Sequence, residues 1–154
     1  MKVHRLNKKQ KIPMNILDVF DFFSSPENLS KITPKRLGFN IMTPRPIEMK
    51  EGQLIDYTIK ILAVPVRWTS MITSYDPPHM FVDQQIKGPY SMWHHTHTFK
   101  ELDANHTEVE DEILYAMPLG FVGDMVHSVY VKKDLESIFR YRETTIGKLL
   151  VGQV

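Results

Sequence analysis

Two histidines, His95 and His97, alternate within residues 93–99 of the sequence. Successive side chains of a β-strand point to opposite faces, so both imidazoles share one face if this segment is a strand. Asp83 lies on the preceding apolar segment, and Asp111 lies on the following one. We interpret these four side chains as one polar cluster. A carboxylate can orient an imidazole whose pKa lies near the working pH, which is an arrangement suited to acid–base chemistry.

Three interpretations of this cluster differ in their chemistry. The side chains could hydrogen-bond one another in a network that sets strand register and orients a ligand, and we favour this interpretation. They could instead abstract an acidic proton next to a ketone, or protonate a departing hydroxyl. Both histidines could also bind one metal ion, with Asp83 or Asp111 as a third ligand. The His-x-His spacing has no stronger metal motif beside it, so we expect no metal and no other cofactor.

Aromatic side chains share the face of this cluster. Trp93 is an even number of residues from the two histidines, and Gln85 is two residues from Asp83, so each should share a strand face with them. Aromatic residues of neighbouring segments also fall in their inward-facing sets. An interior that mixes large aromatics with polar groups is typical of a ligand pocket. We therefore expect one cavity lined by Tyr57, Trp68, Asp83, Gln85, Trp93, His95, His97, Asp111 and Tyr115.

The segments around the cluster alternate with a period of two from Phe39 to Tyr115, and their breaks fall at proline, glycine and aspartate. This pattern predicts six antiparallel strands joined by hairpin-length connections. A further strand is expected over residues 3–12, where its polarity suits a sheet edge. Two short helices should follow it, over residues 14–24 and 26–32, the second with Pro26 in its first turn.

The last part of the chain predicts one long helix over about residues 120–150. Its apolar stripe recurs at helical spacing and comprises Val122, Met125, Val126, Val129, Leu135, Ile138, Phe139, Ile146 and Leu149. Such a stripe must cover apolar surface, and the concave face of the sheet is the large candidate. We expect an α+β fold in which a curved antiparallel sheet of about seven strands grips a long C-terminal helix, with two short helices after the first strand. A cavity should remain between sheet and helix.

Composition narrows the classes of partner. The 154 residues suit a single domain, 1–154, and contain no cysteine, which excludes disulfides and thiolate metal sites. A net charge of +1 without a long block of one sign argues against a nucleic-acid partner. No apolar run approaches the roughly 20 residues of a membrane span. The first residues lack the apolar core of a signal peptide. We expect a soluble cytoplasmic protein.

Five stretches of the sequence carry a resemblance to a known family. They are PENLSKITP (26–34), EGQLIDY (51–57), PVRWTS (65–70), PPHMFVDQQIKGPYSMWHHTHTF (77–99) and DLESIFRYR (134–142). With the order of elements, they make the chain resemble the START-like helix-grip superfamily, also called SRPBCC. More specifically, the chain looks like a bacterial branch described as polyketide cyclase/dehydrase-like. The resemblance spans nearly the whole chain and implies a hydrophobic ligand cavity under the long helix.

We therefore expect the protein to bind a small lipophilic or aromatic molecule as a carrier, sensor or accessory protein. The alternative is a cyclase/dehydratase-like enzyme that holds a polycarbonyl chain in a reactive fold, with the His/Asp cluster as its acid–base group. A protein-interaction module without a ligand is a third interpretation, but it leaves the polar interior unexplained. His127, in the long helix, is expected near the pocket mouth without a catalytic role.

Overall fold

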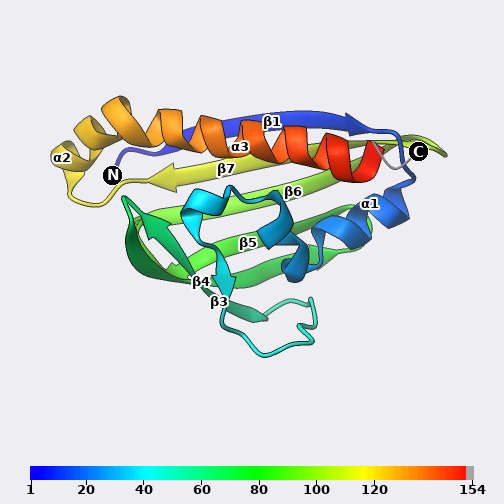
Figure 1. Cartoon of the computed structure of the whole chain (residues 1–154), viewed down its shortest axis with the longest axis horizontal. Coiled ribbons are helices and arrows are strands. Elements are labelled where there is room, and N and C mark those ends of the chain that lie inside the picture. The colour runs from blue at the N-terminus through cyan, green and yellow to red at the C-terminus, as the bar shows by residue number, and fades with distance from the viewer. Residues whose placement is uncertain (152–154) are drawn as a thin grey trace.

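The computed structural model describes residues 1–151, so the last three residues of the predicted domain 1–154 lie outside the described part. Within it, seven strands form one antiparallel sheet in the order β1-β7-β6-β5-β4-β3-β2. Figure 1 shows this sheet curving around the C-terminal helix. The strands are β1 (His4–Ile12), β2 (Asn40–Ile41), β3 (Leu54–Ile61), β4 (Val64–Asp76), β5 (Met80–Lys87), β6 (Met92–Asp103) and β7 (His106–Ala116). The predicted α+β helix-grip architecture is confirmed.

Short helices carry the chain from β1, at one edge of the sheet, to β2 at the other. They are α1 (Ile16–Phe23) and two 3-10 helices, η1 (Pro26–Ile32) and η2 (Lys35–Leu37). Asn15 caps α1, since its side-chain oxygen accepts the Asp18 backbone N–H at 2.9 Å. In the segment before β3, where the sequence predicts alternation from Phe39 onward, the structure has a strand only at β2, and most of the remaining residues are irregular.

One continuous helix follows the sheet and comprises α2 (Gly120–Val126), the π-helical turn η3 (His127–Val131), α3 (Lys132–Ile146) and the π-helical turn η4 (Gly147–Val151). Its extent agrees with the predicted 120–150. No helix in the described residues is long and apolar enough to cross a membrane.

The first half of the predicted apolar stripe faces solvent, contrary to expectation. Leu135, Phe139 and Ile146 are buried, whereas Met125 is 55% and Val129 is 76% exposed. Two features explain the difference. Figure 1 shows α2 at the end of the sheet where the N-terminus lies. The π-helical turn is also wider than an α-helical turn, so it shifts the phase of the helix. The inward side of the first half consequently carries Gly123 and His127.

The strand register puts the predicted side chains on the concave face. Asp83 pairs with His95 across β5 and β6, and His97 pairs with Asp111 across β6 and β7. Both histidines are buried, whereas the alternate side chains of β6 are more exposed. Two apolar clusters pack on this face. One contains Phe20, Phe81 and Phe99 beneath α1, and the other contains Trp68, Trp93 and Phe139 beneath α3.

Candidate functional site

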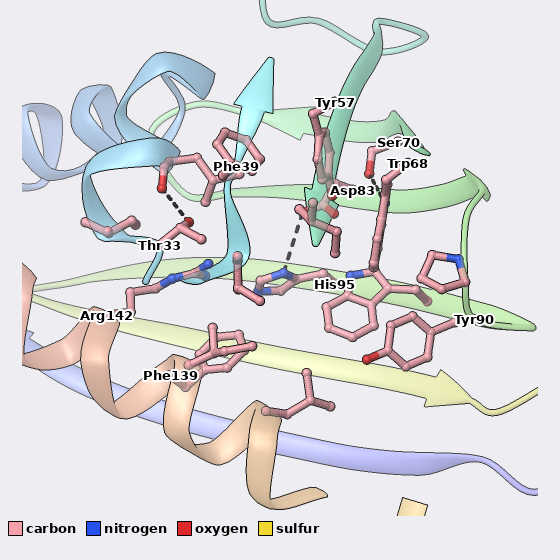
Figure 2. A pocket seen from close by; sticks show the side chains of 18 of the residues that line it. Thr33, Phe39, Tyr57, Trp68, Ser70, Asp83, Tyr90, His95, Phe139 and Arg142 are labelled. Atoms are coloured by element: carbon pink, nitrogen blue, oxygen red, sulfur yellow. Dashed lines mark hydrogen bonds and ion pairs between the residues drawn. The ribbon is translucent and has the colours of Figure 1, made fainter. Parts of the chain in front are cut away.

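A cavity of about 740 Å³ lies between the concave face of the sheet, the short helices and α3. Figure 2 shows it from close by, with side chains from β3 to β6 on one side and α3 on the other. The sheet contributes aromatic and polar side chains, whereas α3 contributes Asp134, Leu135, Ile138, Phe139 and Arg142. This volume falls within the range of roughly 300–1,000 Å³ typical of small-molecule sites.

Four aromatic rings form one continuous wall of the cavity. Trp68 and Trp93 meet edge to face with ring centroids 5.2 Å apart, and Tyr57 stacks on Trp68 at 5.7 Å. Tyr90 closes the group at 4.9 Å from Trp93. The Trp68 indole N–H donates to Ser70 Oγ at 3.0 Å, so its polar atom is satisfied and its ring faces remain for contact. Burial raises the pKa of Tyr57 and of Tyr90, so both phenols stay protonated at neutral pH.

The polar cluster is a box of two imidazoles and two carboxylates. His95 Nε2 lies 2.8 Å from Asp111 Oδ1, and His97 Nε2 lies 2.6 Å from Asp83 Oδ2. The crossed distances are longer, 3.7 Å from His95 Nδ1 to Asp83 and 3.2 Å from His97 Nδ1 to Asp111. The two imidazole rings stack with centroids 3.7 Å apart. Each histidine therefore has one hydrogen-bonded carboxylate and a second one nearby.

The box makes its members titrate differently. Burial opposes ionisation of Asp111, but its hydrogen bond to His95 and the nearby His97 outweigh burial and lower the pKa of Asp111. Burial and the charge of His97 lower the pKa of His95. Burial also acts against a charged His97, but the carboxylates of Asp111 and Asp83 outweigh it and raise the pKa of His97. His97 is therefore the preferred carrier of the proton, and His95 is the neutral imidazole.

Six of the nine predicted side chains lie on the cavity wall: Tyr57, Trp68, Asp83, Trp93, His95 and His97. For the other three, the expected cavity contact needs correction. The Gln85 amide braces the β5–β6 turn by donating to the Tyr90 carbonyl oxygen at 2.7 Å. Asp111 lies behind the histidines, and the Tyr115 hydroxyl contacts His127 instead. None of these three residues is among the side chains that line the cavity in the described part of the chain.

Arg142 is a cavity-lining residue that the sequence interpretation missed. Its signal was present, because it lies three residues after Phe139 and four before Ile146, on the face that α3 buries. Arginine side chains are mostly exposed, so a charged residue at this position was not predicted to line the cavity.

A second polar cluster lies outside the cavity lining, at the start of the long helix. His127 Nε2 lies 2.7 Å from the Tyr115 hydroxyl, and the His127 ring stacks on His4 with centroids 3.5 Å apart. His4 Nε2 also lies 3.5 Å from Asp124. His127 is buried against His4 of β1 and Tyr115 of β7 and does not itself line the cavity, although its neighbours Val126 and Tyr130 do. Its expected place near the pocket mouth stays a prediction.

Three side chains of the box, Asp83, His95 and His97, could each offer one ligand atom to a metal ion, with these atoms within 4.8 Å of one another. A metal would have to replace the hydrogen bonds that now use these atoms. The 2.6 Å between His97 and Asp83 is a hydrogen-bond distance, shorter than the roughly 3.3 Å between two ligands of tetrahedral zinc. Absence of a tightly bound metal stays a prediction, which elemental analysis of the purified protein tests.

The sequence matches no family model and no curated protein. Among solved structures, a START superfamily protein from Mycobacterium smegmatis is 13% identical, with a TM-score of 0.71 over 95% of this chain and 99% of that one. The Zhui aromatase/cyclase from Streptomyces sp. R1128 is 12% identical, with a TM-score of 0.68 over 96% of both chains. Norcoclaurine synthase from Thalictrum flavum is 15% identical, with a TM-score of 0.69 over 99% of this chain and 96% of that one. At these identities the likeness concerns the fold alone, and the fold of this chain is the START-like helix grip.

Proposed function

We propose that the protein binds a small lipophilic or aromatic molecule between the sheet and the long helix, as a carrier, sensor or accessory protein. The observation that carries this proposal is the 740 Å³ cavity with its wall of four aromatic rings. Apolar surface removed from water favours binding by roughly 25 cal/mol per Å² before the costs of association are counted. A cytoplasmic location and the absence of a nucleic-acid partner stay predictions from composition.

Polar groups on the same wall would orient the ligand. Asp83, His95 and His97 meet the cavity from the sheet, and each is already hydrogen-bonded within the box. A network held in this way has little freedom to rearrange, so it favours ligands whose polar end matches it. The aromatic wall supplies affinity, whereas the box helps to orient the ligand.

A pair of tryptophan substitutions on one helix tests the cavity as the binding site. Ile138→Trp places a large ring on the cavity wall, whereas Val129→Trp places the same ring on the exposed outer face. We expect Ile138→Trp to weaken binding of the neutral fluorophore N-phenyl-1-naphthylamine at least tenfold and Val129→Trp to leave it unchanged. Equal binding by both variants would locate the probe elsewhere and contradict the proposal. Native mass spectrometry of freshly purified protein would reveal a natural ligand that co-purifies.

A second candidate function is a cyclase/dehydratase-like enzyme, favoured by the box itself. Two cavity-lining imidazoles with pKa values displaced in opposite directions provide a base, His95, and an acid, His97. One of the similar structures is an aromatase/cyclase. His95→Gln and Asp83→Asn separate the two functions. An enzyme would lose turnover of the co-purifying molecule while still binding it. Binding without turnover by the wild-type protein would leave the carrier function standing.

A further inference from the structure

Three cationic side chains line the cavity among mainly apolar ones: Arg36, Lys60 and Arg142. Arg36 is paired with Asp134 at 2.8 Å and Lys60 is exposed, which leaves Arg142 as the candidate for contact with a ligand. The Arg142 Cζ atom lies 4.7 Å from the ring centroid of Phe139, the neighbouring side chain on α3. Figure 2 shows the Arg142 head group pointing into the pocket toward His95. The same view places Trp68 and Tyr90 on the far side of His95 from Arg142. The cavity therefore has a cationic end and an aromatic end.

Within residues 1–151 the Arg142 guanidinium contacts the Phe139 ring but forms no ion pair. Its Nε atom is buried without a hydrogen-bond partner. The arginines that form ion pairs within residues 1–151 are Arg5, Arg36 and Arg67. The carboxylates of Asp111 and Asp83 act on Arg142 through their charges, but their hydrogen bonds are made to the two histidines. The two terminal amino groups of the guanidinium, which carry four of its five N–H donors, are thus the part of Arg142 that a cavity ligand could contact.

This arrangement constrains the chemistry of the ligand. An entirely apolar ligand would displace water from the guanidinium and leave a buried charge without acceptors, which opposes binding. A carboxylate accepts two parallel N–H bonds from a guanidinium and carries one balancing charge. A phosphate monoester carries nearly two negative charges, and the two aspartates of the box would repel the second. A neutral carbonyl or hydroxyl would satisfy fewer donors.

We propose that the ligand is a lipophilic carboxylic acid whose carboxylate is bound by Arg142 and whose apolar body lies against the aromatic wall. This inference rests on the proposed function, because it names the class of ligand that the same cavity takes. Selectivity for the acid comes from Arg142, while the box of His95, His97 and the aspartates borders the adjoining part of the ligand.

The first test compares ligands that share one apolar body. Dodecanoate, 1-dodecanol and dodecyl phosphate are each used to displace N-phenyl-1-naphthylamine from the wild-type protein, at a pH above the pKa of the free acid. We expect dodecanoate to compete roughly 10- to 100-fold more strongly than 1-dodecanol, as for hydrogen bonds to a charged group. We expect dodecyl phosphate to compete less strongly than dodecanoate. Equal competition by dodecanoate and dodecanol, or stronger competition by the phosphate, would overturn the proposal.

The second test moves to the arginine. Arg142→Met keeps the length of the side chain and removes its donors, whereas Arg142→Lys keeps the charge and removes the planar fork. Arg140→Met is the matched control, since Arg140 lies exposed on the same helix. We expect Arg142→Met to abolish the preference for dodecanoate, Arg142→Lys to reduce it several-fold and Arg140→Met to leave it intact. An unchanged preference in Arg142→Met or Arg142→Lys would overturn the assignment.

The neutral fluorophore separates this inference from the function on which it rests. If the wild-type protein fails to bind N-phenyl-1-naphthylamine, the cavity is not a site for lipophilic molecules and the proposed function fails. If the fluorophore binds but the carboxylate preference is missing, only the inference about Arg142 fails. If Arg142 is only a structural residue, Arg142→Met lowers the midpoint of thermal unfolding while the preference for dodecanoate is unchanged in Arg142→Lys, which also refutes the proposal.

Discussion

Two chemically identical imidazoles in the box have different environments. Both His95 and His97 are buried beside the same two carboxylates. His97 makes the shorter hydrogen bond, 2.6 Å to Asp83, and has Asp111 3.2 Å away. A proton on His97 disfavours a second proton on the ring stacked 3.7 Å from it. The box therefore favours one imidazolium between two carboxylates, and the two rings titrate as a coupled pair.

NMR titration of the two imidazoles tests this asymmetry. We expect His97 to titrate above the ordinary value of 6.5 and His95 to titrate below it. Because the folded-state pKa of His97 is raised, its contribution to stability is complete below pH 6.5 and is lost as the pH rises through the folded-state value. For His95, whose pKa is lowered, stability falls as the pH drops below 6.5.

Asp111→Asn provides the matching perturbation. It removes one of the two carboxylates that raise the pKa of His97, so the pKa of His97 should fall in the variant. Identical titration of both rings in the wild-type protein, or an unchanged His97 in the variant, would contradict the asymmetry.

The strands place successive residues on opposite faces of the sheet, so only every second residue can belong to the site. Trp93 is 8% exposed and lies on the aromatic wall, whereas the next residue, His94, points to the other face and contacts Gln84 at 3.3 Å. Trp93→Ala should lower the free energy of unfolding by about 3–5 kcal/mol. His94→Ala should change it by less than about 0.5 kcal/mol, as for most surface substitutions. Urea unfolding of both variants measures the contrast, and equal losses would show that the face assignment is wrong.

The long helix depends on a close approach at its start. A Cβ atom added to Gly123 would lie 1.9 Å from the Pro118 carbonyl oxygen, a contact with backbone that cannot be relieved locally. A Cβ atom on Gly147, further along the same helix, would meet nothing within 4 Å. The first turn of the helix therefore needs glycine at position 123 in order to pack against the chain that enters it.

Alanine substitution of these two glycines should have opposite effects on thermal unfolding. Gly123→Ala should destabilise the protein by about 1–3 kcal/mol, because the start of the helix must move. Gly147→Ala should stabilise it by up to about 1 kcal/mol, the difference in helix propensity between the two residues. An unchanged free energy of unfolding in Gly123→Ala would show that the start of the helix can move without destabilising the protein.

At the scale of the whole molecule, the cavity lies between two apolar clusters, and this placement couples ligand binding to stability. The cluster under α1 contains Phe20 and Phe99, and the cluster under α3 contains Trp68, Trp93 and Phe139. The second cluster is also a wall of the cavity, so its side chains serve as core and as lining. A ligand that occupies the cavity adds contacts to this cluster only in the folded state.

Ligand should therefore raise the midpoint of thermal unfolding. Saturation with N-phenyl-1-naphthylamine at 100 times its Kd should add about 2.7 kcal/mol to the free energy of unfolding. Calorimetry in the presence and absence of the probe measures the increase, and the Ile138→Trp variant should lose it. An unchanged midpoint for the wild-type protein would mean that the probe binds the folded state without preference.

The sequence by itself determined which residues share a face and how the elements follow one another. A period of two assigns each strand residue to one side of the sheet, and breaks at proline and glycine mark the hairpins. Asp83, His95, His97 and Asp111 could thus be placed on one concave face of three adjacent strands. The helix-grip order followed from one apolar stripe near the C-terminus and from the strands before it. These signals are local, so a single sequence contains them.

Only the tertiary structure decided which inward-facing residues reach the cavity. Gln85 and Tyr115 have the correct parity, yet they contact Tyr90 and His127 instead. The alternation along a strand determines which face of the sheet a residue is on. The helices packed on that face determine whether the residue lines the cavity or contacts another side chain. The phase of the helix was also a tertiary result, because its first half buries Gly123 and His127 and leaves Val129 in solvent. The position of Arg142 opposite the box likewise depends on how α3 packs on strands that are far from it in the sequence. Local periodicity contains no information on that packing.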